Sequence, residues 1–507
     1  MRVLITAAEV YPEMERAFLN ARHEIWASYR IFDLATKLRT PEAKEIGSTW
    51  FDLIVHTLRR GVRLNMVLSD FDPIMTAELH GTTWKSMRAF VAASEAAGPD
   101  APLKVTAAIH PSRVGRPLRL VLWPFVRRRL KRILAGLNEK PLIEREQILA
   151  TMPGLRTHVK RDRDGYLKAT HWPPADMLPA THHQKIAVFD RETLCVGGLD
   201  LNERRYDDKG HHRSRDETWH DVQVMTTDRG YVEEAQRHLE TFLDVTAGLR
   251  KPEPSHDLLL TLSRKRKVTM PFIGPKPLVT ALRDAHLAQV RRAEKLIYLE
   301  TQFFRDTGLA QELAAAGRNN PELEVILILP AAPEDIAFYG NTGADAKYGE
   351  YLQAKCLGIL EDAFGDRIAM GSPVRPETID QDGRDTSAGS PIIYVHAKVS
   401  IFDTTSAIVS SANLNGRSFN WDTEAGVMIE NPETVRYLRH RAFCHWLCET
   451  PEDAFHLPGK AAASWRRRCG DNLSCAPHDR RGFLVTHDRA PAQKIGRPLP
   501  GIPESMV

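Results

Sequence analysis

Residues 181–190 read Thr-His-His-Gln-Lys-Ile-Ala-Val-Phe-Asp, and residues 394–403 read Tyr-Val-His-Ala-Lys-Val-Ser-Ile-Phe-Asp. Both segments contain His-x-Lys, then four mostly apolar residues, then Asp. The match continues downstream, because a small-residue turn at 197–201 has the same offset from His183 as the turn at 410–414 has from His396. A repeat of this extent predicts two copies of one structural unit that need a joint explanation.

Each motif is expected to open a β-strand, because apolar, β-rich runs follow both lysines. Residues two apart in a strand share a face. The spacing therefore predicts two pairs of side chains that project together, His183 with Lys185 and His396 with Lys398. Asp190 and Asp403 lie an odd number of residues after each histidine and face the other way, so we expect them to be structural charge partners.

Two histidines and two lysines that converge on one point suit the chemistry of a phosphodiester. The ammonium groups would neutralise the non-bridging oxygens and the charge that develops on them. One imidazole would attack phosphorus while the other protonates the leaving oxygen. This division of labour requires no metal and no other cofactor, and we predict none. The alternative is a repeat fold with two exposed basic strand starts, which the length of the repeat disfavours.

The duplicated His-x-Lys-x4-Asp pattern resembles the signature of the phospholipase D superfamily, over roughly residues 12 to 450. Three flanking stretches look like phospholipid-cleaving members in particular: Ser-Asp-Phe-Asp-Pro at 69–73, Trp-His-Asp-Val at 219–222 and Ile-Tyr-Leu-Glu-Thr-Gln-Phe-Phe at 297–304. The resemblance implies an α/β fold of two similar α/β-sandwich lobes with pseudo-twofold symmetry. The active site would lie between the lobes.

The resemblance also assigns roles to the motif residues. His183 would be the nucleophile and His396 the general acid, with Lys185 and Lys398 on the phosphate. Asp221 and Glu424 occupy matching places in the two halves and look like the acids that orient the histidines. A carboxylate that accepts from an imidazole N–H fixes the tautomer and stabilises the imidazolium. Asp422 is a rival to Glu424, since residues two apart share a strand face.

Substrate binding is expected from the turns that follow the motifs. Ser411 and Asn413 match the small polar residue and the amide of the family pattern. The first half departs from that pattern, with Gly198 and Asp200 at the same places. A carboxylate at position 200 would repel a phosphate, which puts the binding role of Asp200 in doubt.

The 507 residues suffice for two or three domains. We expect an N-terminal lobe at 1–250 and a C-terminal lobe at 276–450, joined by a linker at 251–275 that is rich in Pro, Gly and charge. Residues 451–507 lack strong periodicity and are expected to form a tail, draped over the body or partly disordered.

Two further segments allow more than one interpretation. Residues 113–134 mix cations with Leu, Trp and Phe, which is compatible with an interfacial segment on an anionic membrane. The other interpretation is a solvated basic surface that Pro117 and Pro124 interrupt. The polar stretch 207–215, whose histidines with His220 could suggest a metal, is expected to be a solvated loop beside the active site.

The favoured function is a phospholipase D-type hydrolase that cleaves the distal phosphodiester of glycerophospholipids at a membrane surface. Alternatives are a phosphatidyltransferase of the cardiolipin-synthase type, a metal-independent nuclease and a catalytically silent binding protein. A net charge of +4 gives little support to an obligatory nucleic-acid partner. The sequence has no apolar run of signal-peptide or transmembrane length. We therefore expect a cytoplasmic or peripheral membrane protein, or secretion without a cleavable N-terminal signal.

Overall fold

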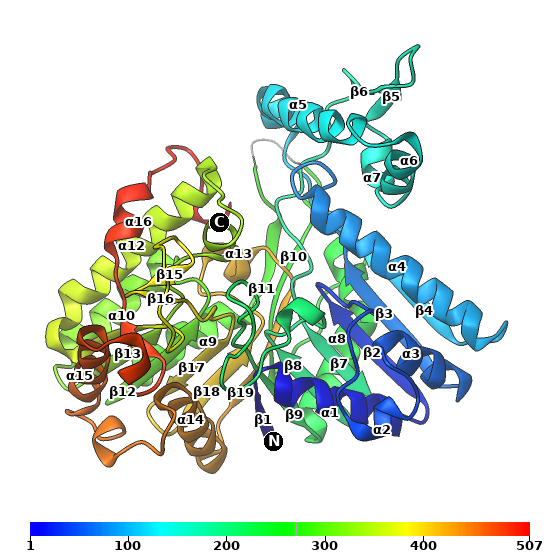
Figure 1. Cartoon of the computed structure of the whole chain (residues 1–507). Helices are drawn as coiled ribbons and strands as arrows, with labels where there is room; N and C mark the ends of the chain where they lie inside the picture. The colour runs from blue at the N-terminus through cyan, green and yellow to red at the C-terminus, as the bar shows by residue number, and fades with distance from the viewer. Residues whose placement is uncertain (269–271, 507) are drawn as a thin grey trace.

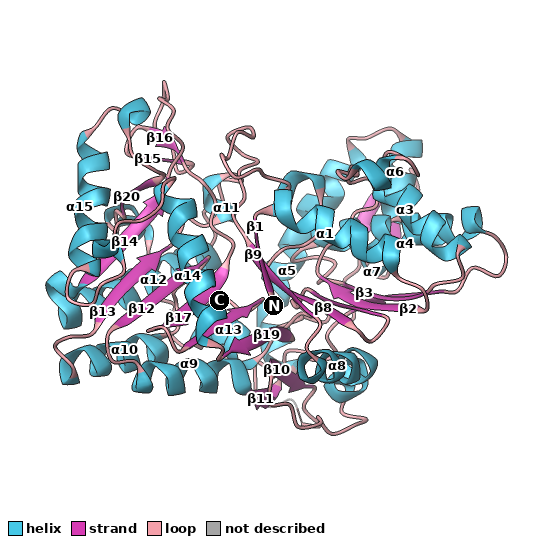
Figure 2. Cartoon of the chain, turned by 90° about the horizontal axis from the view of Figure 1, so that it is seen from below, coloured by secondary structure: helices cyan, strands magenta, loops and turns pink. Residues whose placement is uncertain are grey.

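The computed structural model describes residues 1–268 and 272–506, and it contains two mixed β-sheets flanked by helices (Figures 1 and 2). The first sheet has seven strands within the described residues, in the order β1-β9-β8-β7-β2-β3-β4. We call this sheet and the helices packed on it the first lobe. Its strands are β1 (Arg2–Ile5), β2 (Glu24–Tyr29), β3 (Arg63–Ser69), β4 (Leu103–Ala108), β7 (Ile186–Phe189), β8 (Thr193–Gly197) and β9 (Val222–Thr226).

The second sheet, with its helices, forms the second lobe and repeats this order. It runs β11-β10-β19-β18-β17-β12-β13-β14-β20 in the described part of the chain. Its strands are β10 (Leu258–Arg264), β11 (Lys276–Thr280), β12 (Leu296–Thr301), β13 (Glu324–Ile328), β14 (Ile368–Pro373), β17 (Lys398–Phe402), β18 (Ser406–Ser410), β19 (Glu424–Ile429) and β20 (Leu484–Thr486).

The two lobes share one topology. In each, the motif strand (β7 or β17) pairs antiparallel with β2 or β12 on one side and with β8 or β18 on the other. Strands β2, β3 and β4 then run parallel, as do β12, β13 and β14. The sheets are thus α/β units of equal strand order, as the sequence predicts.

The helices surround the two sheets and fill the connections between their parallel strands. They are α1 (Ala7–Asn20), α2 (Pro41–Lys44), α3 (Trp50–Arg59), α4 (Ala77–Ala97), α5 (Arg116–Asn138), α6 (Leu142–Ala150), α7 (Pro153–Arg156), α8 (Arg229–Ala247), α9 (Ala281–Arg292), α10 (Thr307–Asn319), α11 (Glu334–Ala337), α12 (Ala344–Phe364), α13 (Gly416–Asn420), α14 (Pro432–Leu447), α15 (Ala461–Ser474) and α16 (Ala490–Ile495). Two short hairpins complete the list: β5 (Val159–Arg161) with β6 (Leu167–Ala169), and β15 (Thr386–Ser387) with β16 (Ser390–Pro391).

One hydrophobic core joins the lobes. Ile186 and Val188 of β7 lie in the same buried cluster as Val399 and Ile401 of β17. The alternate residues of β7, Ala187 among them, face a second cluster under α1, α3 and α4. This alternation follows from the two-residue period of a strand that is covered on both faces. It also means that the inner faces of both motif strands are fixed by one core.

Three expectations about the chain's organisation require correction. The segment 251–275 is not only a linker, because residues 258–264 form β10, whose leucines pack in the shared core. The segment 451–507 is structured where it is described: α15 packs through Trp465, and β20 joins the second sheet. Residues 113–134 are not interrupted by proline, since Pro117 lies at the start of α5 and Pro124 lies inside it.

The segment from α5 to β6 stands off the body of the first lobe (Figure 1). It has a small core of its own, to which Val126, Leu130 and Leu134 of α5 contribute. The other face of α5 leaves Leu120, Val121 and Phe125 51%, 72% and 57% exposed. No helix in the described residues is long and apolar enough to cross a membrane.

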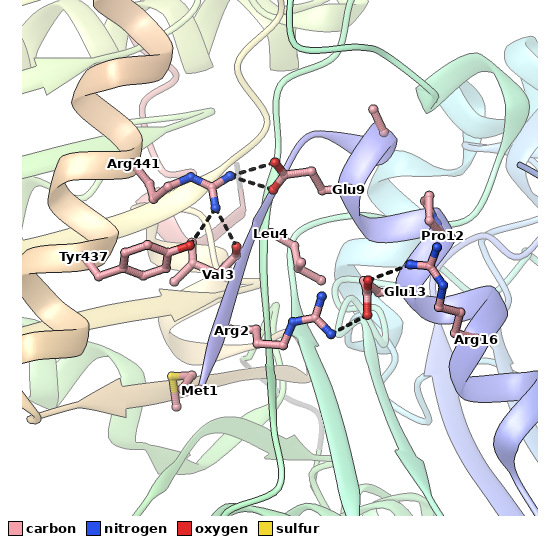
Figure 3. A pocket seen from close by; sticks show the side chains of 11 residues that line it. Met1, Arg2, Val3, Leu4, Glu9, Pro12, Glu13, Arg16, Tyr437 and Arg441 are labelled. Atoms are coloured by element: carbon pink, nitrogen blue, oxygen red, sulfur yellow. Dashed lines mark hydrogen bonds and ion pairs between the residues drawn. The ribbon is translucent and has the colours of Figure 1, made fainter. Parts of the chain in front are cut away.

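A pocket of about 530 Å³ marks the outer junction of the two lobes (Figure 3). Arg441 of α14 reaches across it and donates two hydrogen bonds to the carboxylate of Glu9 on α1, at 2.7 and 2.8 Å. Among the described residues that line this pocket, none belongs to the two motifs. The pocket is therefore a feature of the interface, and the chemistry is expected elsewhere.

Candidate active site

Backbone hydrogen bonds that cross between the lobes hold both motifs in place. The amides of His183 and Gln184 both donate to the carbonyl of Thr423, each at 2.9 Å. In the equivalent arrangement, the amides of His396 and Ala397 donate to the carbonyl of His220, at 2.8 and 3.1 Å. Each motif is thus bound to the residue that precedes the acidic residue of the other half.

This exchange produces two crossed histidine–carboxylate pairs. Nδ1 of His183 lies 3.0 and 3.1 Å from the two carboxylate oxygens of Glu424, which belongs to the second lobe. Nδ1 of His396 lies 2.6 Å from Oδ2 of Asp221, which belongs to the first lobe. Both carboxylates are fully buried. The Nδ1–H groups donate to them, so Nε2 of each imidazole is the ring nitrogen that no carboxylate occupies.

Asp422, the rival to Glu424, has a different environment. Its carboxylate accepts from the backbone N–H of Thr181 at 2.7 Å and lies 3.0 Å from Nε of Arg417. The geometry therefore places Glu424, and not Asp422, on the motif histidine.

Both motif lysines are buried beside their histidines. Nζ of Lys185 donates to the carbonyl of His183 at 2.6 Å and lies 3.2 Å from its Nε2. Nζ of Lys398 donates to the carbonyl of His396 and to Oε1 of Gln302. Burial lowers the pKa of Lys185, and burial together with the nearby Lys185 charge lowers the pKa of Lys398 to about 7.

The four motif side chains form one electrostatic unit. Burial lowers the pKa of His183 and of His396, and the positive charges of both lysines lower each of them further. Burial also raises the pKa of the Asp221 and Glu424 carboxyls, against the opposing influence of the lysines. Burial and mutual repulsion thus destabilise the positive charges of the site. An anion bound there would offset these charges, so the site favours anion binding.

The aspartates that end the two motifs, Asp190 and Asp403, accept hydrogen bonds from backbone amides. Asp190 accepts hydrogen bonds from three successive amides, those of residues 22–24, at 2.7 to 2.9 Å. Asp403 accepts from the amides of residues 294–296 at 2.8 to 2.9 Å. Each therefore fixes the start of the strand beside its motif, β2 or β12, and contacts amides rather than the charge partner we expected.

The turn residues occupy matching places with different contacts. Ser411 Oγ donates to Glu424 Oε2 at 2.5 Å. Gly198 lies against Asp221, where a β-carbon would come within 2.2 Å of Oδ1. A serine at position 198 would therefore collide with the carboxylate that holds His396. Glycine therefore stands at position 198, and serine at position 411, because Asp221 leaves no room for a side chain at position 198.

Asp200 and Asn413, the other two turn residues, differ in their hydrogen bonds. Asp200 is buried, and its Oδ1 accepts from the backbone N–H of Ile31 at 2.8 Å while Oδ2 lies 3.8 Å from Arg205. Oδ1 of Asn413 has no hydrogen-bond partner within the described part of the chain. Oδ2 of Asp200 likewise has no hydrogen-bond partner among these residues, so the difference is that Oδ1 of Asp200 already holds the loop after β2.

Arg30 is a site residue that the sequence reasoning missed. Its positive charge lowers the pKa of His183, as do those of the lysines. The registers Ile25↔Phe189 and Ile297↔Phe402 place Arg30 and Gln302 at equivalent positions, five residues further along β2 and β12. A repeat alignment extended upstream of the motifs would have found this pair.

The stretch 207–215 is not the solvated loop that we expected. Asp207 and His211 are fully buried, although His212 is exposed. Nδ1 of His211 lies 2.7 Å from the Asp207 carboxylate, which also accepts from the backbone N–H of Trp219. This segment therefore packs between the lobes beside the site.

A family model and several curated proteins that resemble this chain point to the same superfamily. Residues 286–446 match the family model described as "Cardiolipin synthase, PLD-like domain". Phospholipase D alpha 1 of Oryza sativa subsp. japonica is 23% identical, over 47% of this chain and 44% of that protein. Phospholipase D1 of Homo sapiens is 26% identical, over 31% of this chain and 16% of its own length. Together with the duplicated motif, these matches support membership of the chain in the phospholipase D superfamily.

The fold agrees with that of a solved superfamily structure. The crystal structure of phosphatidylserine synthase from Haemophilus influenzae Rd KW20 matches with a TM-score of 0.51 and 12% identity, covering 92% of both chains. At this identity the likeness concerns the fold alone. The match spans less than half the length of the curated phospholipases D named above.

Proposed function

We propose that this chain is a phospholipase D-type enzyme that cleaves the distal phosphodiester of glycerophospholipids. The products are phosphatidic acid and a head-group alcohol. The observation that carries this proposal is the pair of crossed contacts, His183 with Glu424 and His396 with Asp221, each beside a buried lysine. Two oriented imidazoles and two cations are the groups that a two-step displacement at phosphorus requires.

In the first step, Nε2 of His183 attacks phosphorus and the bond from phosphorus to the head-group oxygen breaks. His396 gives its Nε2 proton to that oxygen, and the alcohol leaves. Lys185 and Lys398 hold the non-bridging oxygens. In the second step His396 removes a proton from water, the oxygen of that water attacks phosphorus, and the bond to His183 breaks.

The two histidines differ in ways that support this assignment. The side chain of His183 is 13% exposed and that of His396 is 2% exposed, so His183 is the more accessible to a phosphorus atom. The ring of His396 lies 4.7 Å from the ring of Trp219. An aromatic face favours a cationic imidazolium, which suits the residue that must carry the proton.

The membrane is reached through α5 in this proposal. Exposed Leu120, Val121 and Phe125 lie among exposed cations of the same helix, Arg116, Arg128, Lys131 and Arg132. Apolar side chains that enter the acyl boundary, with cations that meet anionic head groups, give a peripheral contact.

A phosphatidyltransferase of the cardiolipin-synthase type is the second candidate. The description of the family model that matches residues 286–446 favours it. The covalent intermediate is the same for both activities, and only the acceptor differs: water for the hydrolase, or the hydroxyl of a second lipid for the transferase.

One experiment separates these activities. Purified protein is incubated with phosphatidylcholine and phosphatidylglycerol, with and without ethanol, and the lipids are analysed by mass spectrometry. We expect phosphatidic acid, and with ethanol also phosphatidylethanol, because alcohol and water compete for one intermediate. Cardiolipin as the main product would favour the transferase. Cleavage of DNA with no change in any lipid would refute the lipid proposal. His183→Ala and His396→Ala should each abolish all products.

A further inference from the structure

Three histidines that the proposed chemistry does not use lie together in the interior. They are His211 and His220 of the first lobe and His445 on α14 of the second lobe. One ring nitrogen of each lies within 4.8 Å of the other two. Nε2 of His211 and Nε2 of His445 are 3.1 Å apart.

The opposite ring nitrogens of two of these residues are already occupied by carboxylates. Nδ1 of His211 lies 2.7 Å from Oδ2 of Asp207, and Nε2 of His220 lies 3.0 Å from Oε2 of Glu300. Each N–H donates to its carboxylate, so His211 Nε2 and His220 Nδ1 are the ring nitrogens that keep a lone pair for a ligand. A carboxylate behind a ligating imidazole is the usual outer contact of a metal site, because it fixes the tautomer and raises the basicity of the ligand.

Nδ1 of His220 is a second, independent observation that points to a ligand at this cluster. His220 is fully buried, and its Nδ1 has no hydrogen-bond partner among the described residues. A buried polar atom without a partner destabilises the fold, and a ligand on that atom removes the penalty.

We propose that His211, His220 and His445 bind one divalent transition-metal ion of the zinc type, which links the two lobes. Three imidazole nitrogens suit zinc, which binds each at about 2.0–2.1 Å in a tetrahedral arrangement. Tetrahedral geometry then sets the nitrogens about 3.3 Å apart, close to the 3.1 Å between His211 and His445. Asp207 and Glu300 supply the negative charge that offsets the buried ion.

The fourth position has a route to solvent. A pocket of about 510 Å³ is lined by His445 together with Lys209, Cys448 and Phe483. An ion can enter through this pocket, and a water molecule can complete its coordination. The site is separate from the phosphate chemistry, in which this ion takes no part.

The ion would act on the position of Asp221. The carbonyl of His220 accepts from the amides of His396 and Ala397, and the next residue, Asp221, orients His396. Arg441, one turn before His445 on α14, already links the lobes through Glu9 (Figure 3). A metal on His445 therefore adds a second link along the same face of α14 and fixes the strand that carries Asp221.

The test measures metal binding and not activity. Full-length protein without a polyhistidine tag is produced in zinc-supplemented medium, and its metal content is measured by mass spectrometry. Stripped protein is then titrated with Co²⁺, whose visible absorption reports four-coordination, and with Zn²⁺ against a chromophoric chelator. We expect about one zinc per chain, a four-coordinate Co²⁺ spectrum and a rise in the thermal midpoint on adding Zn²⁺.

Variants locate the ion. His445→Ala should remove the tight site, and Asp207→Asn should weaken Zn²⁺ binding about 10- to 100-fold. His212→Ala is the matched control, since this neighbouring histidine is exposed and should leave binding unchanged. If His445→Ala does not fold, X-ray absorption of zinc in the wild type decides, and the expected scatterers are nitrogen and oxygen with no sulfur.

Two results would overturn the proposal. Wild-type protein that is free of metal after zinc-rich growth, and that takes up neither Zn²⁺ nor Co²⁺ stoichiometrically, would make the cluster a hydrogen-bonded group of neutral imidazoles. Binding that survives in His445→Ala, or sulfur ligands in the absorption spectrum, would place the ion elsewhere, for example at Cys444 and Cys448.

Discussion

Replacing Glu424 by glutamine tests the crossed pairing most directly, because the change removes a charge and preserves the shape. In the proposed mechanism the ring of His183 becomes cationic as it bonds to phosphorus, and the carboxylate 3.0 Å from Nδ1 stabilises that charge. A hydrogen bond to a charged group contributes about 1.5–3 kcal/mol. The direct charge interaction at this distance is about 5.5 kcal/mol for an effective dielectric constant near 20.

These energies bracket the expected effect. A loss of about 3 kcal/mol lowers the rate about 10²-fold, and a loss of about 5.5 kcal/mol lowers it about 10⁴-fold. We therefore expect Glu424→Gln to reduce kcat by about 10² to 10⁴-fold in head-group release from phosphatidylcholine. KM should change little, because the carboxylate acts on the histidine and not on the bound lipid.

Asp422→Asn is the matched control for this substitution. Asp422 lies two residues away and is also buried, but its contacts are Thr181 and Arg417 and not a motif histidine. The kcat of Asp422→Asn should stay within about tenfold of the wild-type value. Thermal midpoints of both variants show whether each is folded. The reasoning is refuted if Asp422→Asn loses as much kcat as Glu424→Gln, or if Glu424→Gln keeps a fifth or more of the wild-type kcat while folded.

The other predictions concern proton transfer, pH, phosphate binding and the membrane. His396→Ala should accumulate a phospho-adduct on His183 from a substrate with an activated leaving group, and peptide mapping that finds it on another residue would reverse the assignment. The Lys398 ammonium, with its pKa lowered to about 7, loses its proton as the pH rises through that value. Affinity for tungstate, a phosphate mimic, should therefore fall above pH 7. Lys398→Arg should move this fall in affinity to higher pH. Arg30→Ala should weaken tungstate binding at least tenfold, and unchanged binding would remove Arg30 from the site. Exchanging Leu120, Val121 and Phe125 for glutamine should reduce binding to anionic vesicles at least tenfold in sedimentation, because two CH₂ groups already contribute about 1.6 kcal/mol and a tenfold change corresponds to about 1.4 kcal/mol. The control Leu249→Gln, at an exposed site off α5, should leave binding unchanged.

The sequence predicts the parts of this site that depend on local spacing. His183 and Lys185 lie just before β7, and His396 lies two residues before Lys398, with which β17 begins. The structure holds each lysine against its histidine, as the spacing predicts. The equal strand order of the two sheets follows from the repeat itself. These features require only the period of a strand and the length of the match.

Features that depend on long-range packing could not be predicted from spacing. Gly198 replaces the serine of the second half because Asp221 fills the space, and this contact joins residues of different strands. Strand β10, by contrast, has a local signal, because residues 258–264 read Leu-Leu-Leu-Thr-Leu-Ser-Arg, an apolar run inside the Pro-rich segment that pairs with β19. The burial of His211 depends on α14, which lies more than 200 residues further along the chain.

The crossed pairs explain why the two lobes share one core. Glu424 contacts the histidine of the first lobe, and Asp221 contacts that of the second. Neither lobe alone therefore has a complete histidine–carboxylate pair, and a small shift of one sheet against the other would break both pairs together. A continuous apolar cluster with strands from both sheets resists such a shift, because well-packed interiors do not deform gradually. The Arg441–Glu9 bridge, and the metal that we propose on His211, His220 and His445, act at the same junction. If the proposed mechanism holds, the interface between the lobes sets the geometry on which catalysis depends, so substitutions there should lower kcat even where they contact neither histidine.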